Sequence, residues 1–206
     1  MDFSKPAKLF SVMSLADLRK LQYYYQRNSM YRPNLAAFIL LLINILTVQL
    51  LGVINSSLSV WGCLLYLPAL FFFSSTVLLD RARVIIVLTL TGFSLDSVYS
   101  TPGGFHSFAL IICYLVAKNW LHSGQNGELV RPYYLQIIAN VLISFGLIFV
   151  LNFRGDSLGS WAWPNIIVDI SLSTFILAAI TPWFAGLSGE LLQVAFSSEQ
   201  KEDANI

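Results

Sequence analysis

Charged side chains are scarce in this sequence. Asp, Glu, Lys and Arg make up 11% of its 206 residues, whereas a soluble domain carries about 25%. Hydrophobic residues make up 56%, and the mean hydropathy is +0.69. The net charge is +1, which by itself gives no indication of nucleic-acid binding. The composition therefore predicts an integral membrane protein that contacts the lipid bilayer and no nucleic acid.

The residue types that build catalytic and metal sites are also rare. The two histidines, His106 and His122, fall on opposite sides of the membrane in the topology given below, and neither an HExxH nor a GxSxG motif occurs. The two cysteines, Cys63 and Cys113, lie in apolar runs without metal-ligand spacing. We therefore expect no enzyme activity, no metal and no cofactor.

Six apolar stretches predict an all-α membrane protein with six transmembrane helices. A bilayer-spanning helix needs about 20 residues. The third stretch, residues 84–98, reaches that length only if Arg81 and Arg83 extend to one membrane surface and Asp96 lies near the other. The predicted domains are a segment at 1–33, a transmembrane domain at 34–185 and a polar tail at 186–206. The stretches are 34–55, 58–79, 84–98, 104–121, 133–151 and 163–183.

The distribution of positive charge predicts the orientation. Of the twelve Lys and Arg residues, Arg154 alone falls on the outer side of the six-span topology. The positive-inside rule then places both termini in the cytoplasm, and we expect a multi-pass protein of the bacterial cytoplasmic (inner) membrane. In segment 1–33, Ser14 and Asp17 suit a helix start. An amphipathic helix on the inner leaflet is the preferred interpretation, and a mobile basic tail is the alternative.

Several predicted spans carry polar or small residues at helical spacing. Gln136, Asn140 and Ser144 follow one stripe of the fifth span, and such residues form hydrogen bonds between membrane helices. Asp169 in the sixth span has either a structural or a functional role, because acids inside membranes are costly. A small-residue seam on the fourth span favours close helix contact; it consists of Ala109, Cys113 and Ala117.

Asp96 is the most informative residue, because it ends one span just before a turn sequence that contains Pro102, Gly103 and Gly104. Its carboxylate either accepts hydrogen bonds from backbone amides of this turn or pairs with a charged group of a partner or substrate. Bracing of the turn is the preferred interpretation, and it predicts that Asp96→Asn is tolerated. His106 follows the turn, and a lone histidine there is typical of a packed, hydrogen-bonded residue.

The order of residues between Thr91 and Ala117 is distinctive. Gly92 is followed four residues later by Asp96, then by a short Ser/Thr/Pro/Gly loop that reaches Gly104, and then by an apolar helix with a Tyr-Leu pair. This order resembles the bacterial rod-shape-determining membrane protein MreD family, and the resemblance extends over residues 68–120. The family is non-enzymatic, and its six-helix fold is similar to that of the substrate-binding subunits of energy-coupling-factor transporters.

The resemblance implies a scaffold of the cell-elongation complex, which synthesises peptidoglycan in rod-shaped bacteria. The implied partners are an MreC-like membrane protein and peptidoglycan-elongation enzymes, reached through helix–helix contacts. The alternatives are a vitamin- or small-molecule-binding subunit of an energy-coupling-factor transporter and a proton-coupled carrier that uses Asp169. The candidate contacts for a partner or substrate are Asp96, Gly92, Gly104, His106 and Asp169.

Overall fold

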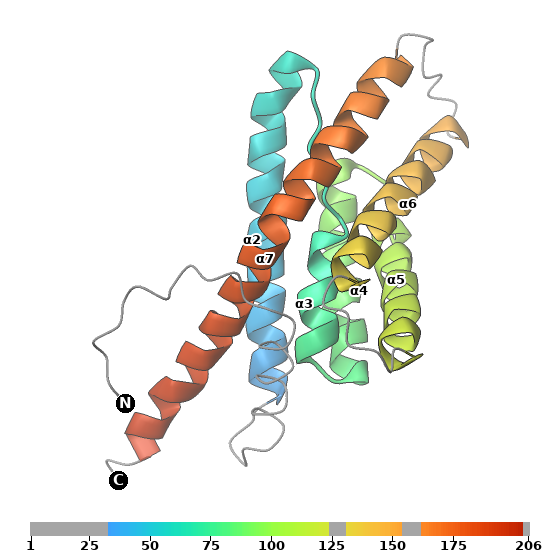
Figure 1. The fold of residues 1–206 in the computed structure, drawn as a ribbon. Coiled ribbons are helices and arrows are strands. Elements are labelled where there is room, and N and C mark those ends of the chain that lie inside the picture. The colour runs from blue at the N-terminus through green and yellow to red at the C-terminus, as the bar shows by residue number, and fades with distance from the viewer. Residues whose placement is uncertain (1–32, 124–130, 154–161, 204–206) are drawn as a thin grey trace.

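The computed structural model describes residues 33–123, 131–153 and 162–203, and all regular elements in these ranges are helices. Successive segments run antiparallel to one another in a bundle (Figure 1). The all-α prediction is confirmed, while most of segment 1–33 lies outside the described residues. The elements are α2 (Pro33–Leu58), the short 3-10 helix η2 (Ser59–Trp61), α3 (Leu70–Leu78), α4 (Arg81–Tyr99), α5 (Phe105–Ser123), α6 (Arg131–Phe153) and α7 (Ala162–Asp203).

Four helices among the described residues are long and apolar enough to cross a membrane: Asn34–Trp61, Arg81–Tyr99, Tyr134–Leu151 and Asn165–Leu192. A shorter apolar helix covers Phe105–Asn119. Large apolar side chains face outward along these helices, for example Phe38 at 62%, Leu46 at 60% and Phe175 at 76% exposure. So much exposed apolar surface is stable in lipid but not in water. The chain is therefore a membrane protein.

Helix α4 begins and ends close to the charged residues that were predicted to mark its two ends. It runs from Arg81 to Tyr99, with Asp96 in its last turn. At the other end, the Arg83 guanidinium donates to Asp80 at 2.5 Å and to the side chain of Asn34 at 2.8 Å. The short third apolar stretch is thus part of a complete helix with ionisable groups at both ends.

The prediction of a helix over 58–79 is wrong. Helix η2 ends at Gly62, whose φ of 69° lies in the left-handed region, and residues 63–69 are nonhelical before α3 begins at Leu70. Pro68 marks the end of this interruption, because proline lacks the amide hydrogen that a helix interior needs and disfavours helical geometry at Leu67. We call residues 63–69 the nonhelical segment.

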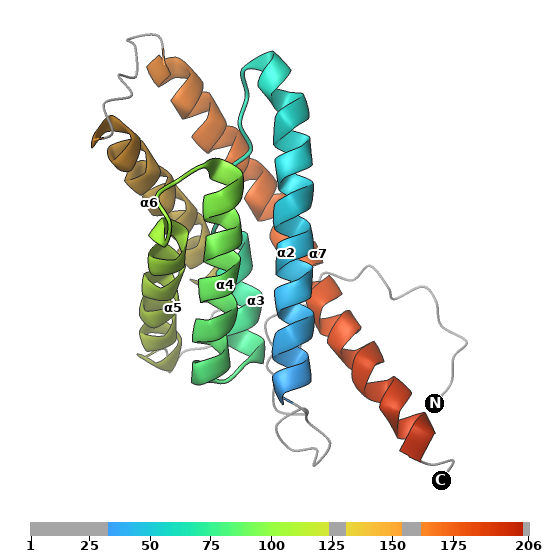
Figure 2. The ribbon, with the colours of Figure 1, turned by 180° about the vertical axis from the view of Figure 1, so that it is seen from behind.

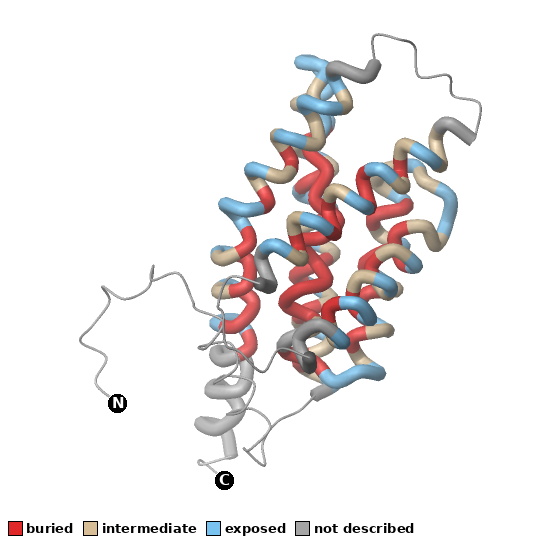
Figure 3. The backbone as a smooth tube through the Cα atoms, turned by 45° about the vertical axis from the view of Figure 1, so that its right-hand side comes forward, coloured by how far each residue is buried: buried red, intermediate tan, exposed pale blue. Residues whose placement is uncertain are grey.

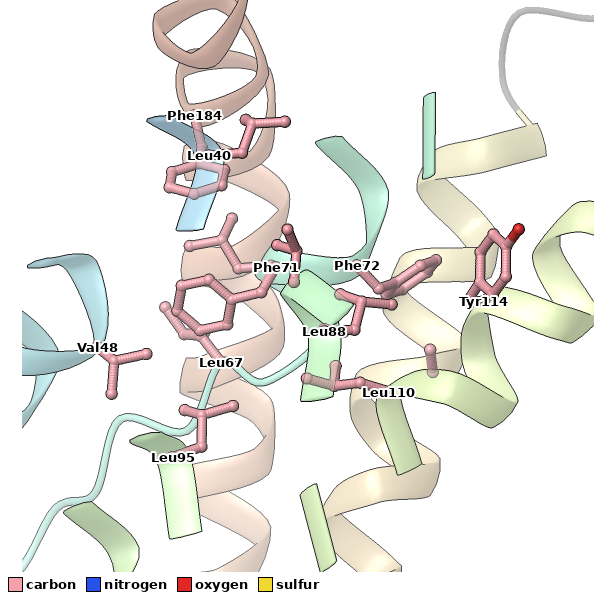
Figure 4. Packing of buried hydrophobic residues seen from close by; sticks show 14 of the residues in the cluster. Leu40, Val48, Leu67, Phe71, Phe72, Leu88, Leu95, Leu110, Tyr114 and Phe184 are labelled. Atoms are coloured by element: carbon pink, nitrogen blue, oxygen red, sulfur yellow. The ribbon is translucent and has the colours of Figure 1, made fainter. Parts of the chain in front are cut away.

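The nonhelical segment and α3 form the centre of the bundle. Every residue from 65 to 75 is buried, and this run lies in the middle of the molecule, surrounded by the other helices (Figure 3). Phe71 and Phe72 point to opposite sides of α3 (Figure 4). The Phe71 ring meets Phe184 of α7 edge-on at 6.0 Å between centroids, and Phe72 points toward Tyr114 of α5. Because lipid is as apolar as these side chains, close packing and hydrogen bonds hold the bundle together.

Two antiparallel helices, α4 and α5, pack closely against each other, and α4 also packs against α2 (Figure 2). Helix α7 crosses the bundle and continues through the predicted polar tail to Asp203. Figures 1 and 2 show its C-terminal part extending beyond the other helices. The end of the apolar stretch near residue 183 therefore does not coincide with the end of the helix.

Candidate functional site

The nonhelical segment places backbone amides and carbonyls inside the bundle without helical partners. Such groups cost several kcal/mol each in an apolar environment unless they are hydrogen-bonded. Side chains from four surrounding helices supply these bonds. We call this set the polar frame; its members are Asn55, Tyr99, Gln136, Asn140, Asp169 and Ser173.

Asn55 of α2 and Tyr99 of α4 form hydrogen bonds with the backbone of Leu65. The Leu65 amide donates to the Asn55 side-chain oxygen at 2.8 Å, and the Asn55 side-chain nitrogen donates back to the Leu65 carbonyl at 2.8 Å. The Tyr99 hydroxyl donates to the same carbonyl at 2.9 Å. Both polar groups of Leu65 are thus satisfied in the pattern that a neighbouring strand would provide.

The predicted stripe on α6 faces the same segment. Asn140 donates to the Tyr66 carbonyl at 3.2 Å and accepts from the Ala69 amide at 3.4 Å. Gln136 donates to the Ala69 carbonyl at 3.0 Å. The Ser144 hydroxyl bonds the Asn140 carbonyl of its own helix at 2.8 Å. All three predicted packing residues are buried, and Gln136 and Asn140 form hydrogen bonds with backbone groups of the nonhelical segment.

Helix α7 completes the polar frame. The Leu64 amide donates to the Asp169 carboxylate at 2.9 Å, and the Tyr66 amide donates to the Ser173 hydroxyl at 2.9 Å. Of the two roles that the sequence left open for Asp169, the structural one is therefore supported by a contact. Neither Asn55 nor Tyr99 was among the predicted site residues, because no sequence pattern links them to a segment that reads as a helix.

The Asp96 carboxylate braces the turn between α4 and α5. One oxygen accepts from the Gly104 amide at 2.6 Å. The other accepts from the Thr101 hydroxyl at 2.7 Å, the His106 amide at 3.1 Å and His106 Nδ1 at 2.6 Å. The bracing geometry predicted for Asp96 is present. Because both oxygens act as acceptors, an Asn amide cannot replace the carboxylate, and the expectation that Asp96→Asn is tolerated is revised.

His106 connects this turn to the centre of the bundle. With Nδ1 protonated toward Asp96, Nε2 of the neutral ring accepts from the Tyr66 hydroxyl at 2.6 Å. Asp96 and His106 have exposures of 5% and 0%, so neither side chain is open to a substrate. The chain of contacts therefore ties the turn to the nonhelical segment.

Gly92 lies where α4 and α5 approach each other closely. A Cβ atom at this position would collide with the backbone and hydroxyl of Ser107, whose hydroxyl donates to the Thr89 carbonyl at 2.8 Å. Gly104 has a φ of 94°, a left-handed conformation that glycine adopts without strain. Both glycines thus serve the geometry of the α4–α5 hairpin.

The small-residue seam on α5 faces the bundle. Ala117 is buried, while Ala109 and Cys113 are partly buried and pack against the hydrophobic core. Small side chains allow helices to approach closely in a membrane. The seam therefore contributes to packing within the chain.

A partly open cavity of about 110 Å³ lies between α6, α7 and the nonhelical segment. Aliphatic side chains such as Leu147 and Ile170 form most of its wall, and Tyr66 and Asp169 also line it. Asp96 is not among the lining residues. The structure therefore separates the two predicted acids: Asp96 braces the hairpin, and Asp169 lies at the cavity.

In the described parts of the chain, no three His, Cys, Asp or Glu side chains come close enough to hold a metal ion together. Comparison of the sequence and the structure with protein families, curated proteins and solved structures found no match. The fold and the site define a helical membrane protein whose central segment is held by side-chain hydrogen bonds.

Proposed function

We propose that this protein is a non-enzymatic integral membrane scaffold of the bacterial cell-elongation complex, similar to MreD. The resemblance of residues 68–120 to that family is the basis of the proposal. The supporting observation is that the residues carrying the resemblance face inward. Gly92, Asp96 and His106 are buried in the α4–α5 hairpin, where they make it rigid, so a partner would meet the outer faces of the helices.

The same proposal includes six membrane crossings with both termini in the cytoplasm. The second crossing consists of the nonhelical segment and α3. Residues 63–69 can extend up to about 23 Å, and α3 adds about 14 Å. Together they exceed the roughly 30 Å of the hydrocarbon core. The cost of a nonhelical crossing is offset by the polar frame, because irregular backbone is stable at membrane depth where it is buried in protein.

The cavity beside Asp169 is small for the ligand that the alternative, a vitamin-binding transport subunit, would hold at this position. Pockets for drug-sized ligands measure about 300–1,000 Å³, whereas the cavity beside Asp169 measures about 110 Å³. The transport alternative also expects Asp96, Asp169 and Trp163 to contact one ligand. Asp96 instead directs both carboxylate oxygens at its own chain.

Photo-crosslinking in living cells tests the scaffold proposal. A photoreactive phenylalanine analogue replaces one exposed phenylalanine at a time: Phe38 on α2, Phe108 on α5, Phe145 on α6 or Phe175 on α7. Phe72, which is 1% exposed, is the matched control. We expect an MreC-like protein to crosslink at one helix face and not at Phe72, and we expect depletion of the protein to cause loss of rod shape. Normal shape after depletion, with no elongation protein crosslinked at any position, would contradict the proposal.

A further inference from the structure

The cavity beside α7 contains a carboxylate whose hydrogen-bonding capacity is only partly used. Asp169 accepts one hydrogen bond, from the Leu64 amide at 2.9 Å, whereas a carboxylate has about four acceptor positions. Among the described residues, no Lys, Arg or His lies within ion-pair distance of it. Asp169 is partly buried. An acid in an apolar wall favours a cationic ligand, because a charge that is partly withdrawn from water is costly without a counter-charge.

The cavity has the size of a small organic group. An apolar protein cavity of about 150 Å³ holds benzene, so about 110 Å³ has room for a stem of a few carbon atoms. The aliphatic wall, which includes Leu147, Ile148 and Ile170, suits an alkyl stem. The wall and the acid together define a ligand with an apolar part and one positive charge.

We propose that this cavity binds a primary ammonium group carried on a short alkyl stem. The ammonium pairs with the Asp169 carboxylate, and the stem lies along the aliphatic side chains of α6 and α7. A free alkylamine and the ethanolamine headgroup of a phospholipid both carry this chemistry. The inference does not depend on the scaffold function.

Thermal unfolding of the full-length protein in detergent tests the proposal, with n-butylammonium as the probe. Butanol and butyrate are controls at equal concentration and ionic strength. We expect a saturable rise in melting temperature with butylammonium alone. Asp169→Asn keeps an acceptor for the Leu64 amide but removes the charge, so it should weaken the apparent affinity at least about tenfold. Asp80→Asn, an exposed acid beside Arg83 and outside the cavity wall, should leave the affinity unchanged.

A second variant keeps the test decisive if Asp169→Asn does not fold. Ile148→Trp fills the cavity without changing charge, and it should abolish the response to butylammonium. To identify the source of the ammonium, stability is compared in bilayer discs containing phosphatidylethanolamine or phosphatidylglycerol. Stabilisation by phosphatidylethanolamine that Asp169→Asn removes would assign the site to a lipid headgroup, and a response to butylammonium alone would assign it to a free amine. An equal response to butanol, or no Asp169-dependent response in either arm, would overturn the proposal.

Discussion

Replacement of Asp96 tests the central structural interpretation. In Asp96→Ala two backbone donors lose their acceptor: the Gly104 amide and the His106 amide. His106 Nδ1 keeps the Thr101 hydroxyl oxygen, 3.2 Å away, as an acceptor. Each unsatisfied buried donor costs about 1–3 kcal/mol, so we expect a loss of about 2–6 kcal/mol. This is a large share of the 5–15 kcal/mol typical of folded proteins.

Asp96→Asn should be less harmful than Asp96→Ala but still destabilising. If the amide oxygen occupies the position facing Thr101 and His106, the amide nitrogen faces the Gly104 amide, and two donors then meet. One unpaired amide costs about 1–3 kcal/mol. Asp80→Ala, at the opposite end of α4, is the matched control. Its exposed pair with Arg83 should contribute about 1 kcal/mol or less.

The assay is equilibrium unfolding of the purified variants in mixed detergent micelles, together with their abundance in membranes and cell shape. A free energy of unfolding for Asp96→Ala within about 1 kcal/mol of wild type would refute the bracing role, because the donors around Asp96 would then have other acceptors. A separate outcome, wild-type stability of Asp96→Asn with loss of rod shape, would show that the charge of Asp96 serves a partner instead.

Three further variants test other parts of the structure by the same unfolding assay. Gly92→Ala should lower the free energy of unfolding by about 1–3 kcal/mol or more, because its methyl group collides with α5. Gly186→Ala, whose methyl group meets open space, should be neutral or slightly stabilising. Equal effects of the two variants would contradict the close crossing of α4 and α5. Asn140→Leu should lower the free energy of unfolding by about 2–4 kcal/mol, because two backbone groups of the nonhelical segment lose their partners. Ser144→Ala should lower it by less than about 1 kcal/mol, because the Ser144 hydroxyl bonds its own helix. Unchanged stability of Asn140→Leu would argue against the role of the polar frame. Tyr66→Phe removes one hydrogen bond to the buried histidine and should cost about 1–3 kcal/mol, and an unchanged stability would mean that the bond contributes nothing.

Much of the α-helical architecture follows from local sequence. A long apolar run can satisfy its backbone inside a membrane only as a helix or a closed barrel, and this rule correctly predicts α2, α4, α5 and α6 to within a few residues. The role of Asp96 is also local, because the residues it contacts lie within ten positions along the chain. A carboxylate next to a Pro-Gly-Gly turn has backbone donors within reach whatever the rest of the fold does.

The nonhelical segment depends on tertiary structure. Its own residues are apolar apart from Tyr66, and Pro68 shows only that a regular helix is interrupted nearby. A helix with a proline kink would satisfy the same local sequence. The segment is stable in its observed form because the polar frame comes from residues as distant as Ser173, which is 107 positions from Tyr66. No local pattern can encode such partners.

The sequence by itself therefore determined that the chain is a helical membrane protein and where Asp96 braces a turn, since solvent preference and short-range hydrogen bonding decide both. The purpose of the polar stripe on α6 and of Asp169 was decided by the tertiary structure. From the sequence, these residues are equally consistent with hydrogen bonds between helices. In the folded protein they instead form hydrogen bonds with the backbone of the nonhelical segment. The same packing left Asp169 beside an apolar cavity, a juxtaposition that exists only once α6, α7 and the nonhelical segment have come together.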